Sequence, residues 1–244
     1  MKVEIWSDVV CPWCAIGKHR FEKALAHFAH RDEVDVSWHS FELDPTAPRE
    51  PDGDLNDHLA AKYGVSRAQA EEMHRQMTET AAADGWDFHF ERARCANTFD
   101  AHRLLHLAAE RHIQTAVKER LLRGYFTEGE LLSDHETLVR LGAEARLDAD
   151  EARAVLASDR YADEVRADQR QAQAYGITGV PFYVIDRKYG VAGAQPPEAL
   201  LQVLDKAWAE VHPLQVLTPA GGRADVRSAS SAQDDGCADG TCAV

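Results

Sequence analysis

The stretch that decides the fold is KVEIWSDVVCPWC, residues 2–14. Apolar and polar side chains alternate in its first half, which predicts a β-strand with both faces largely covered. A helix is expected to begin at Cys11 and Pro12, because proline is tolerated in a first helical turn and apolar residues then recur at helical spacing. The stretch therefore places Cys11 and Cys14 at the start of a helix that directly follows a strand.

Two cysteines in this position are suited to thiol–disulfide exchange. Unpaired N–H groups and the helix dipole favour a thiolate on the first sulfur. The second cysteine, one turn along the helix, can attack a mixed disulfide and release the substrate. We therefore predict Cys11 as the nucleophile and Cys14 as the resolving thiol. Asp8, three residues before Cys11, would raise the pKa of the Cys11 thiol if it lies close, and so opposes the helix dipole.

The pattern after this helix describes a split α/β domain. The predicted elements are a strand at 34–41, a nearly all-helical block from Asn56 to about Gln173, a strand at 182–185, its hairpin partner at 188–194 and a helix that begins at Pro196 and Pro197. A sheet that is interrupted by a helical block and then resumes indicates an α/β domain with a second, helical lobe.

The composition is that of an ordinary soluble globular protein. The 244 residues include 27 basic and 41 acidic side chains, which give a net charge of −14, and the charge stays negative even with all 12 histidines protonated. This argues against nucleic acid as a partner. No stretch approaches the roughly 18 apolar residues of a membrane span, and no signal peptide follows Met1, so we expect no membrane partner and a cytoplasmic location.

The other three cysteines do not form a structural disulfide framework in a cytoplasmic chain. Cys237 and Cys242 form a C-x4-C pair at the end, beyond a segment rich in Gly, Ala, Ser and Asp, so residues 213–244 are expected to form a flexible tail. As a flexible linker, the 25 residues from His212 to Cys237 span a root-mean-square distance on the order of 25–30 Å, so the tail pair could relay electrons to Cys11. The alternative is that Cys237 and Cys242 have no redox role. Cys95 is expected to be a semi-buried packing residue rather than a third redox centre.

Five short motifs carry a family resemblance. They are residues 8–14 (DVVCPWC), 41–45 (FELDP), 97–103 (NTFDAHR), 179–181 (GVP) and 193–197 (GAQPP). In this order they resemble the FrnE-like branch of the DsbA family, over the chain from Val3 to about Trp208. The resemblance implies a thioredoxin-like fold interrupted by an all-helical insertion domain, and disulfide oxidoreductase or isomerase activity on protein disulfides. The implied parts are residues 1–45, the insertion at 46–173, residues 174–212 and the tail at 213–244.

The resemblance also implies residues around the cysteines. Pro181 matches the family's cis-proline, and Val180 before it would present its backbone to an extended substrate. By their residue types, Trp13 and Phe182 suggest an apolar platform for a peptide, with Pro12 between the two cysteines, and aromatic residues of a core or an interface are the alternative. Substrates would be protein or peptide thiols and disulfides. No bound cofactor or metal is expected, and glutathione or thioredoxin would serve as the electron partner.

A third group of residues lies on the helical lobe. Asn97, His102 and Arg103 match a recurrent family motif, and their polar side chains either face the cleft between the lobes or make structural hydrogen bonds. Asn97 is then expected to cap a helix.

Two other functions remain open for the same residues. Cys11, Cys14, Cys237 and Cys242 could supply four thiolates to one zinc ion, although a helix continues after the first pair. The relatives of the family also include glutathione-dependent enzymes, the kappa-class transferases and the hydroxychromene-carboxylate isomerases. These typically have serine in the position of Cys11, so the cysteine pair argues for the redox function.

Overall fold

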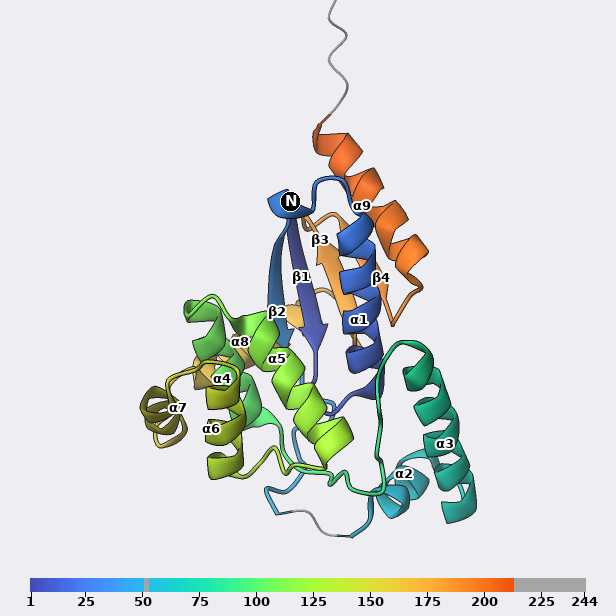
Figure 1. Cartoon of the computed structure of the whole chain (residues 1–244), viewed down its shortest axis with the longest axis vertical. Helices are drawn as coiled ribbons and strands as arrows, with labels where there is room; N and C mark the ends of the chain where they lie inside the picture. The colour runs from blue at the N-terminus through green and yellow to red at the C-terminus, as the bar shows by residue number, and fades with distance from the viewer. Residues whose placement is uncertain (51–52, 213–244) are drawn as a thin grey trace, which may run out of the picture. The chain divides into compact units, whose positions relative to one another are not determined.

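A mixed four-stranded sheet lies at the centre of the computed structural model, which describes residues 1–50 and 53–212 (Figure 1). The strands are β1 (Lys2–Ser7), β2 (Asp35–Ser40), β3 (Phe182–Ile185) and β4 (Tyr189–Ala192), in the order β2-β1-β3-β4. β1 pairs parallel to β2 and antiparallel to β3, and β3 pairs antiparallel to β4. All four predicted strands are confirmed, and the predicted tail lies outside the described residues.

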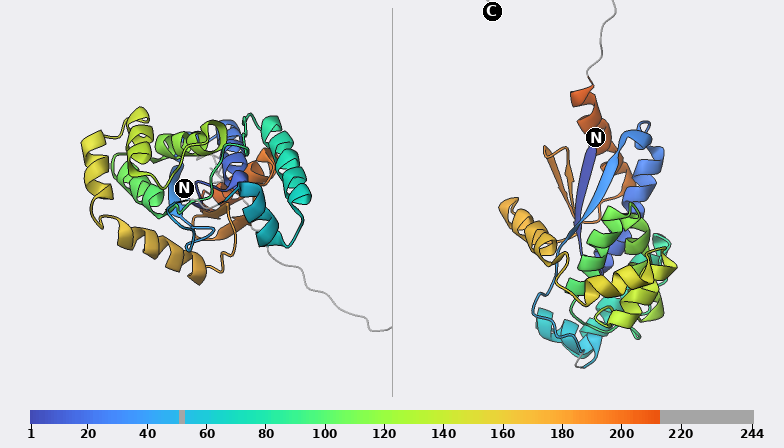
Figure 2. Two further views of the ribbon diagram at one scale, coloured as in Figure 1. Left: turned by 90° about the horizontal axis from the view of Figure 1, so that it is seen from below. Right: turned by 90° about the vertical axis from the view of Figure 1, so that its left-hand side faces the viewer.

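Helices cover both faces of the sheet, as the alternation in β1 predicts. Val3 and Ile5 point to the face covered by α1 (Pro12–His27) and α9 (Pro197–Val211). Trp6 points to the opposite face, where it packs with Ala172 of α8 (Ala162–Ala174). The right-hand view of Figure 2 shows α8 on one side of the strands and α1 with α9 on the other. The apolar residues of a six-residue strand thus contribute to two separate cores.

The remaining helices lie in two groups beside the start of α1 (Figure 1). One group is the pair α2 (Leu55–Tyr63) and α3 (Arg67–Ala83). The other contains α4 (Phe99–Glu110), α5 (Gln114–Arg123) with its π-helical continuation η2 (Gly124–Glu128), α6 (His135–Glu144) and α7 (Ala149–Leu156). A short 3₁₀-helix, η1 (Arg31–Glu33), precedes β2. Among the described residues no helix is both long enough and apolar enough to span a membrane.

The helical block differs from its prediction in the segment 84–98, which is not helical. Its aromatic side chains make contacts that an isolated helix would not provide. The indole N–H of Trp86 donates to the Ala15 carbonyl at 2.9 Å, and Phe88 stacks on Phe126 with ring centroids 4.3 Å apart. Tertiary packing therefore determines the backbone here and overrides helix propensity.

α8 lies at the end of the segment that was predicted as the insertion. The predicted insertion, 46–173, includes nearly all of α8, yet α8 packs on the sheet through Ala172 and accepts a hydrogen bond from the Trp6 indole at the Asp168 carbonyl, 3.0 Å away. α8 also contacts α4, where His106 lies 3.1 Å from the Asp168 carboxylate, so α8 connects the sheet and the helical lobe. Residues 1–212 cluster as one unit.

Candidate active site

Cys11 and Cys14 lie between the end of β1 and the first turn of α1, as predicted. Cys11 is the N-cap of α1, and its carbonyl accepts hydrogen bonds from the N–H groups of Cys14 (3.0 Å) and Ala15 (3.2 Å). Both cysteines are free thiols. Cys14 is fully enclosed, whereas Cys11 lines a cavity. A substrate can therefore reach the Cys11 sulfur, and Cys14 can act only from inside the protein.

The loop before β3 faces Cys11. The Val180–Pro181 peptide bond is cis, as the motif at 179–181 predicts, and the Cys11 thiol donates to the Val180 carbonyl at 3.6 Å. α1 approaches this loop closely because residue 17 is glycine. A Cβ on Gly17 would lie 2.8 Å from Cγ of Pro181 and 2.6 Å from the Tyr183 hydroxyl.

The cavity beside Cys11 has a volume of about 610 Å³. Of the predicted substrate-contacting residues, Pro12, Trp13 and Val180 line it with Cys11. Pro181 does not line this cavity, and neither does Phe182, contrary to the prediction. Phe182 packs against the cluster of Trp6, Ala172, Ile177 and Val184 instead, because alternate residues of β3 face opposite sides of the sheet.

Much of the cavity wall comes from α2 and α3, which the sequence did not assign to the site. These helices contribute Leu55, His58, Leu59, Lys62, Tyr63, Met73, His74 and Met77. Four of the six exposed large hydrophobic side chains in the described residues line it, namely Trp13, Leu43, Tyr63 and Met73. Met73 and Met77 are four residues apart and so lie on one face of their helix. A helix face that packs in a core has the same spacing, so this pattern alone does not indicate a binding site. The cavity therefore combines the Cys11 thiol with a group of exposed apolar side chains.

Cys95 also reaches this cavity. Its side chain is half-buried, as expected, and burial raises the pKa of its thiol. It therefore remains mainly in the thiol form at neutral pH.

The motif on the helical lobe has a structural role, and the prediction that it faces the cleft is wrong for His102 and Arg103. Both are buried, and neither lines the cavity. Arg103 pairs with Asp100 at 2.8 Å and donates to the Arg160 carbonyl at 2.9 Å. Asn97 accepts from the Phe99 N–H at 3.0 Å, one residue before the N-cap Thr98. Asn97 thus stabilises the helix start, as the alternative proposed.

His102 connects the helical lobe to the loop before Cys11. Its Nε2 lies 3.1 Å from Oδ1 of Asp8, whose two oxygens also accept from the backbone N–H groups of Val9 (2.7 Å) and Leu43 (2.8 Å). Burial raises the pKa of the Asp8 carboxyl, but these bonds, the charge of His102 and that of Lys118 bring it below its ordinary value. Asp8 is therefore a buried, charged carboxylate.

The two active-site thiols titrate as a pair. The hydrogen bond with Cys14 and burial raise the pKa of the Cys11 thiol, and the Asp8 charge adds to this, while the Cys14 N–H opposes it. Burial also raises the pKa of Cys14, but the hydrogen bond with Cys11, the charge of Lys118 and the Ser7 hydroxyl bring it below its ordinary value. The net rise in the Cys11 pKa thus comes mainly from Cys14 and from burial, and the Asp8 charge adds a smaller part. After loss of one proton, the two sulfurs share the other.

Lys118 of α5 is a charged neighbour of this pair that sequence reasoning missed. Its side chain is fully buried. Burial lowers the pKa of its ammonium group to about 8, against the charges of Cys14, Asp8 and Cys11, which raise it. The sequence holds one signal for it: Lys118 precedes the buried Leu121 and Leu122 by three and four residues, so it lies on the apolar face of its helix.

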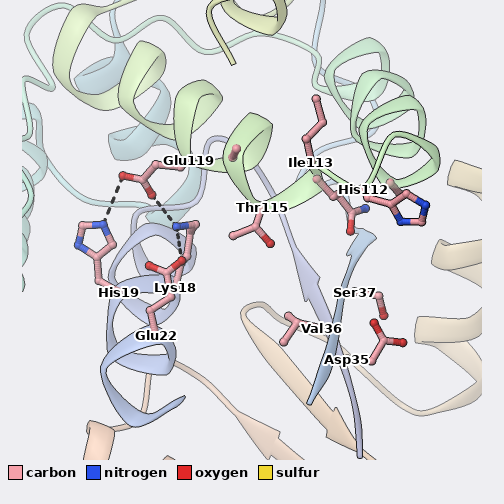
Figure 3. Close-up of a pocket in the computed structure, with 13 residues that line it drawn as sticks. Lys18, His19, Glu22, Asp35, Val36, Ser37, His112, Ile113, Thr115 and Glu119 are labelled. Atoms are coloured by element: carbon pink, nitrogen blue, oxygen red, sulfur yellow. Dashed lines mark hydrogen bonds and ion pairs between the residues drawn. The ribbon is translucent and has the colours of Figure 1, made fainter. Parts of the chain in front are cut away.

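A second, open cavity of about 830 Å³ lies between α1, β2 and α5 (Figure 3). His19, Glu22 and Glu119 bring possible metal-ligand atoms within 4.8 Å of one another there. The Lys18 ammonium already lies 2.7 Å from a carboxylate oxygen of each glutamate. Ion pairs therefore account for this cluster, and they connect the helix of the two cysteines to α5.

Comparison with known proteins agrees with this geometry. The model of the DSBA-like thioredoxin domain family matches residues 2–205. The chain belongs to this family. A probable DsbA oxidoreductase from Streptomyces coelicolor is 49% identical, with a TM-score of 0.83 over 91% of this chain and 97% of that one. The thioredoxin-like fold with a helical insertion, expected from the motifs, is thereby confirmed.

Two further proteins are similar to this chain at lower identity. The Bacillus subtilis protein YwbO is 26% identical over 185 residues, which cover 75% of this chain and 86% of that protein. The cytosolic disulfide reductase DsbM from Pseudomonas aeruginosa, solved with GSH, is 17% identical, with a TM-score of 0.58 over 85% of this chain and 99% of that one. The fold therefore persists at low sequence identity.

Proposed function

We propose that this DSBA-like protein is a thiol–disulfide oxidoreductase or isomerase that acts on disulfides of proteins or peptides through Cys11 and Cys14. The observation that carries the proposal is the position of the Cys11 sulfur. It lies at the N-cap of α1, 3.6 Å from the carbonyl of the residue before a cis-proline, and at the wall of an apolar cavity. A sulfur so placed can meet an extended peptide and a resolving thiol at once.

Reduction of a substrate disulfide proceeds in two steps. The Cys11 thiolate attacks one sulfur of a substrate disulfide, which forms a mixed disulfide and releases the other sulfur as a thiolate. The Cys14 thiolate then attacks the Cys11 sulfur, forms the Cys11–Cys14 disulfide and releases the second substrate thiolate. Reversal of both steps oxidises a substrate dithiol. Attack by a substrate thiolate on the mixed disulfide gives isomerisation.

The Val180 backbone supplies a contact that becomes available only during the reaction. In the free protein the Cys11 thiol donates to the Val180 carbonyl. A sulfur in a mixed disulfide carries no proton, so this carbonyl is then free to accept a hydrogen bond from an extended substrate. Trp13, Leu43, Tyr63 and Met73 would cover apolar side chains next to the substrate cysteine.

The proposal includes a family branch, a cellular location and an electron partner. We place the chain in the FrnE-like branch, because its five motifs occur in that branch's order. A cytoplasmic location and glutathione or thioredoxin as the electron partner fit the charge and cysteine pattern, and the DsbM structure contains GSH in a protein of this fold. The relay through Cys237 and Cys242 concerns residues outside the described part of the chain.

Insulin reduction and refolding of a scrambled disulfide substrate test the function. Cys11→Ser is expected to abolish both activities, whereas Cys14→Ser is expected to retain attack and accumulate a covalent mixed disulfide, detectable by mass. Thermal unfolding of each variant controls for folding. Activity that survives Cys11→Ser would refute the proposal.

The size of the cavity favours one alternative, a glutathione-dependent isomerase or transferase. About 610 Å³ enclosed by α2 and α3 is enough for a small-molecule substrate. Such an enzyme would keep glutathione-dependent turnover of a small electrophile in Cys11→Ser, so the same variant separates the two functions. Metal analysis of the reduced full chain separates both from a zinc module.

A further inference from the structure

The side chain of Lys118 is unusual because its ammonium group has no carboxylate ion pair and no hydrogen bond among the described residues. Its Nζ is buried and has no hydrogen-bond partner. The nearest aromatic group is the Trp38 ring, whose centroid lies 5.8 Å from Nζ. A buried ammonium group without a partner lowers the stability of a fold. A group with this cost calls for an explanation in function.

The charges that act most strongly on the Lys118 ammonium group lie in or beside the active site. They are Cys11 and Cys14 at the start of α1, Asp8 in the loop before them, and Lys18 one turn further along α1. Asp8 has its hydrogen bonds from His102, Val9 and Leu43, so it requires none from Lys118. The sulfur of Cys14, which is fully buried in the free protein, is the group whose negative charge lacks another buried cation.

α5 is fixed at this position from two sides. On the α1 side, Glu119 meets Lys18 at 2.7 Å and His19 at 3.4 Å (Figure 3). On the β2 side, the indole N–H of Trp38 donates to Thr115 at 3.0 Å. Lys118 lies between these anchors, so its helix cannot shift away from the cysteines without breaking both.

We propose that Lys118 is a positioning residue for the resolving step, in which its ammonium group stabilises the buried Cys14 thiolate. This inference rests on the proposed oxidoreductase function. In the mixed disulfide the Cys11 sulfur has no proton to share, so the hydrogen bond that stabilises a Cys14 thiolate in the free protein is lost. The Cys14 proton leaves to solvent, the thiolate forms the S–S bond with Cys11, and the bond from Cys11 to the substrate sulfur breaks. Lys118 keeps its own proton throughout.

The test separates the two steps in a full-length chain carrying Cys95→Ser, Cys237→Ser and Cys242→Ser. The reduced chain is mixed with the aromatic disulfide DTNB. Attack by Cys11 releases a first coloured thiolate, and resolution by Cys14 releases a second. Lys118→Met is expected to slow the second release about tenfold at pH 7 and to move its pH midpoint up by about one unit, with a smaller effect on the first.

Raising the pH is expected to restore the second release in Lys118→Met, because Cys14 then ionises without help. The midpoint of urea unfolding is expected to rise, since an unpaired buried charge has been removed. Lys206→Met, which removes an exposed lysine on α9, is the control with the same change in net charge, and both phases should match those of the parent. Lys118→Gln guards against an effect specific to methionine.

Two results would overturn the inference. One is a second release in Lys118→Met and Lys118→Gln with the rate and pH midpoint of the parent. The other is a slow second release that stays slow at high pH, which would give Lys118 a structural role alone. A parent chain that releases no thiolate at the first step would instead refute the proposed function itself.

Discussion

Gly17 is the residue that lets α1 approach the cis-proline loop. A Cβ at this position would overlap the rigid ring of Pro181 and the hydroxyl of the buried Tyr183. The ring and the helix must then move apart, and the distance from the Cys11 sulfur to the Val180 carbonyl grows with them. The absence of a side chain at Gly17 thus allows the close approach that keeps the Cys11 sulfur near the Val180 carbonyl.

We predict that Gly17→Ala lowers the free energy of unfolding by about 1–3 kcal/mol, the usual effect of overpacking in a core. Urea unfolding measures it. Gly179→Ala is the matched control for stability, because a Cβ at Gly179 would meet no atom within 4 Å and its φ is not positive. Equal unfolding midpoints for the two variants would contradict the close approach of α1 and Pro181.

At the scale of elements, the pair α2 and α3 acts as a wall of the cavity rather than as part of the sheet domain. Its apolar side chains are exposed on the cavity side, and Met73 is one of them. If this wall covers apolar substrate side chains, a charge there weakens substrate binding without touching the sulfur chemistry.

Met73→Glu is therefore expected to raise the KM for an apolar peptide disulfide about tenfold, which corresponds to about 1.4 kcal/mol of lost apolar contact, with kcat little changed. Steady-state kinetics with a peptide series of graded hydrophobicity gives the answer. Val211→Glu, which charges an exposed apolar residue on α9 outside the cavity, is the control. If KM is unchanged in both variants, α3 does not contact the substrate.

One carboxylate of α8 adds polar contacts with the sheet and with α4. Asp168 meets His39 at 2.6 Å, His106 at 3.1 Å and the Ser40 N–H at 2.8 Å. Burial raises the pKa of this carboxyl, but the hydrogen bonds from His106, His39 and Ser40 bring it well below its ordinary value of 3.8. The carboxylate thus connects α8 with β2 and α4.

Because its pKa is lower in the folded state, Asp168 stabilises the fold above about pH 4, and this contribution falls by about 1.4 kcal/mol per pH unit below the unfolded-state pKa. Asp168→Asn is expected to lose about 2–3 kcal/mol at pH 7, and the deficit relative to the parent should shrink by about 1 kcal/mol at pH 3. Urea unfolding at both pH values tests this. Asp163→Asn, at an exposed site on the same helix, should change stability little at either pH. A deficit for Asp168→Asn that is the same at pH 7 and pH 3 would contradict the lowered pKa.

The sequence predicts those features that depend on neighbours along the chain. The strand at 182–185 matches β3 at both ends, and the cysteine pair lies at the helix start where the proline places it. Features that depend on contacts between residues far apart in the chain could not be predicted from the sequence. His19 and Glu119 are 100 residues apart, and the burial of Lys118 depends on that pairing of α1 with α5. The irregular backbone of 84–98 is set by the distant partners of Trp86 and Phe88, which no pattern of neighbouring residues predicts.

At the scale of the whole chain, the described residues contain one cysteine pair, and a second pair lies beyond them at Cys237 and Cys242. If the second pair relays electrons, tethering gives it a millimolar effective concentration at Cys11, well above that of a dilute free thiol. The relay then acts only after a first turnover has oxidised Cys11 and Cys14. Substituting the tail cysteines thus leaves the first turnover unchanged and slows those that follow.

Cys237→Ser with Cys242→Ser in the full-length chain is accordingly expected to keep the single-turnover rate of the reduced protein with a model disulfide, while steady-state turnover with glutathione falls several-fold. Stopped-flow and steady-state measurements on one preparation provide both numbers. The first rate is the internal control, because it depends on Cys11 and Cys14 alone. Steady-state turnover equal to that of the parent would mean that the tail thiols are idle, and the active site would then exchange electrons with its free partner directly.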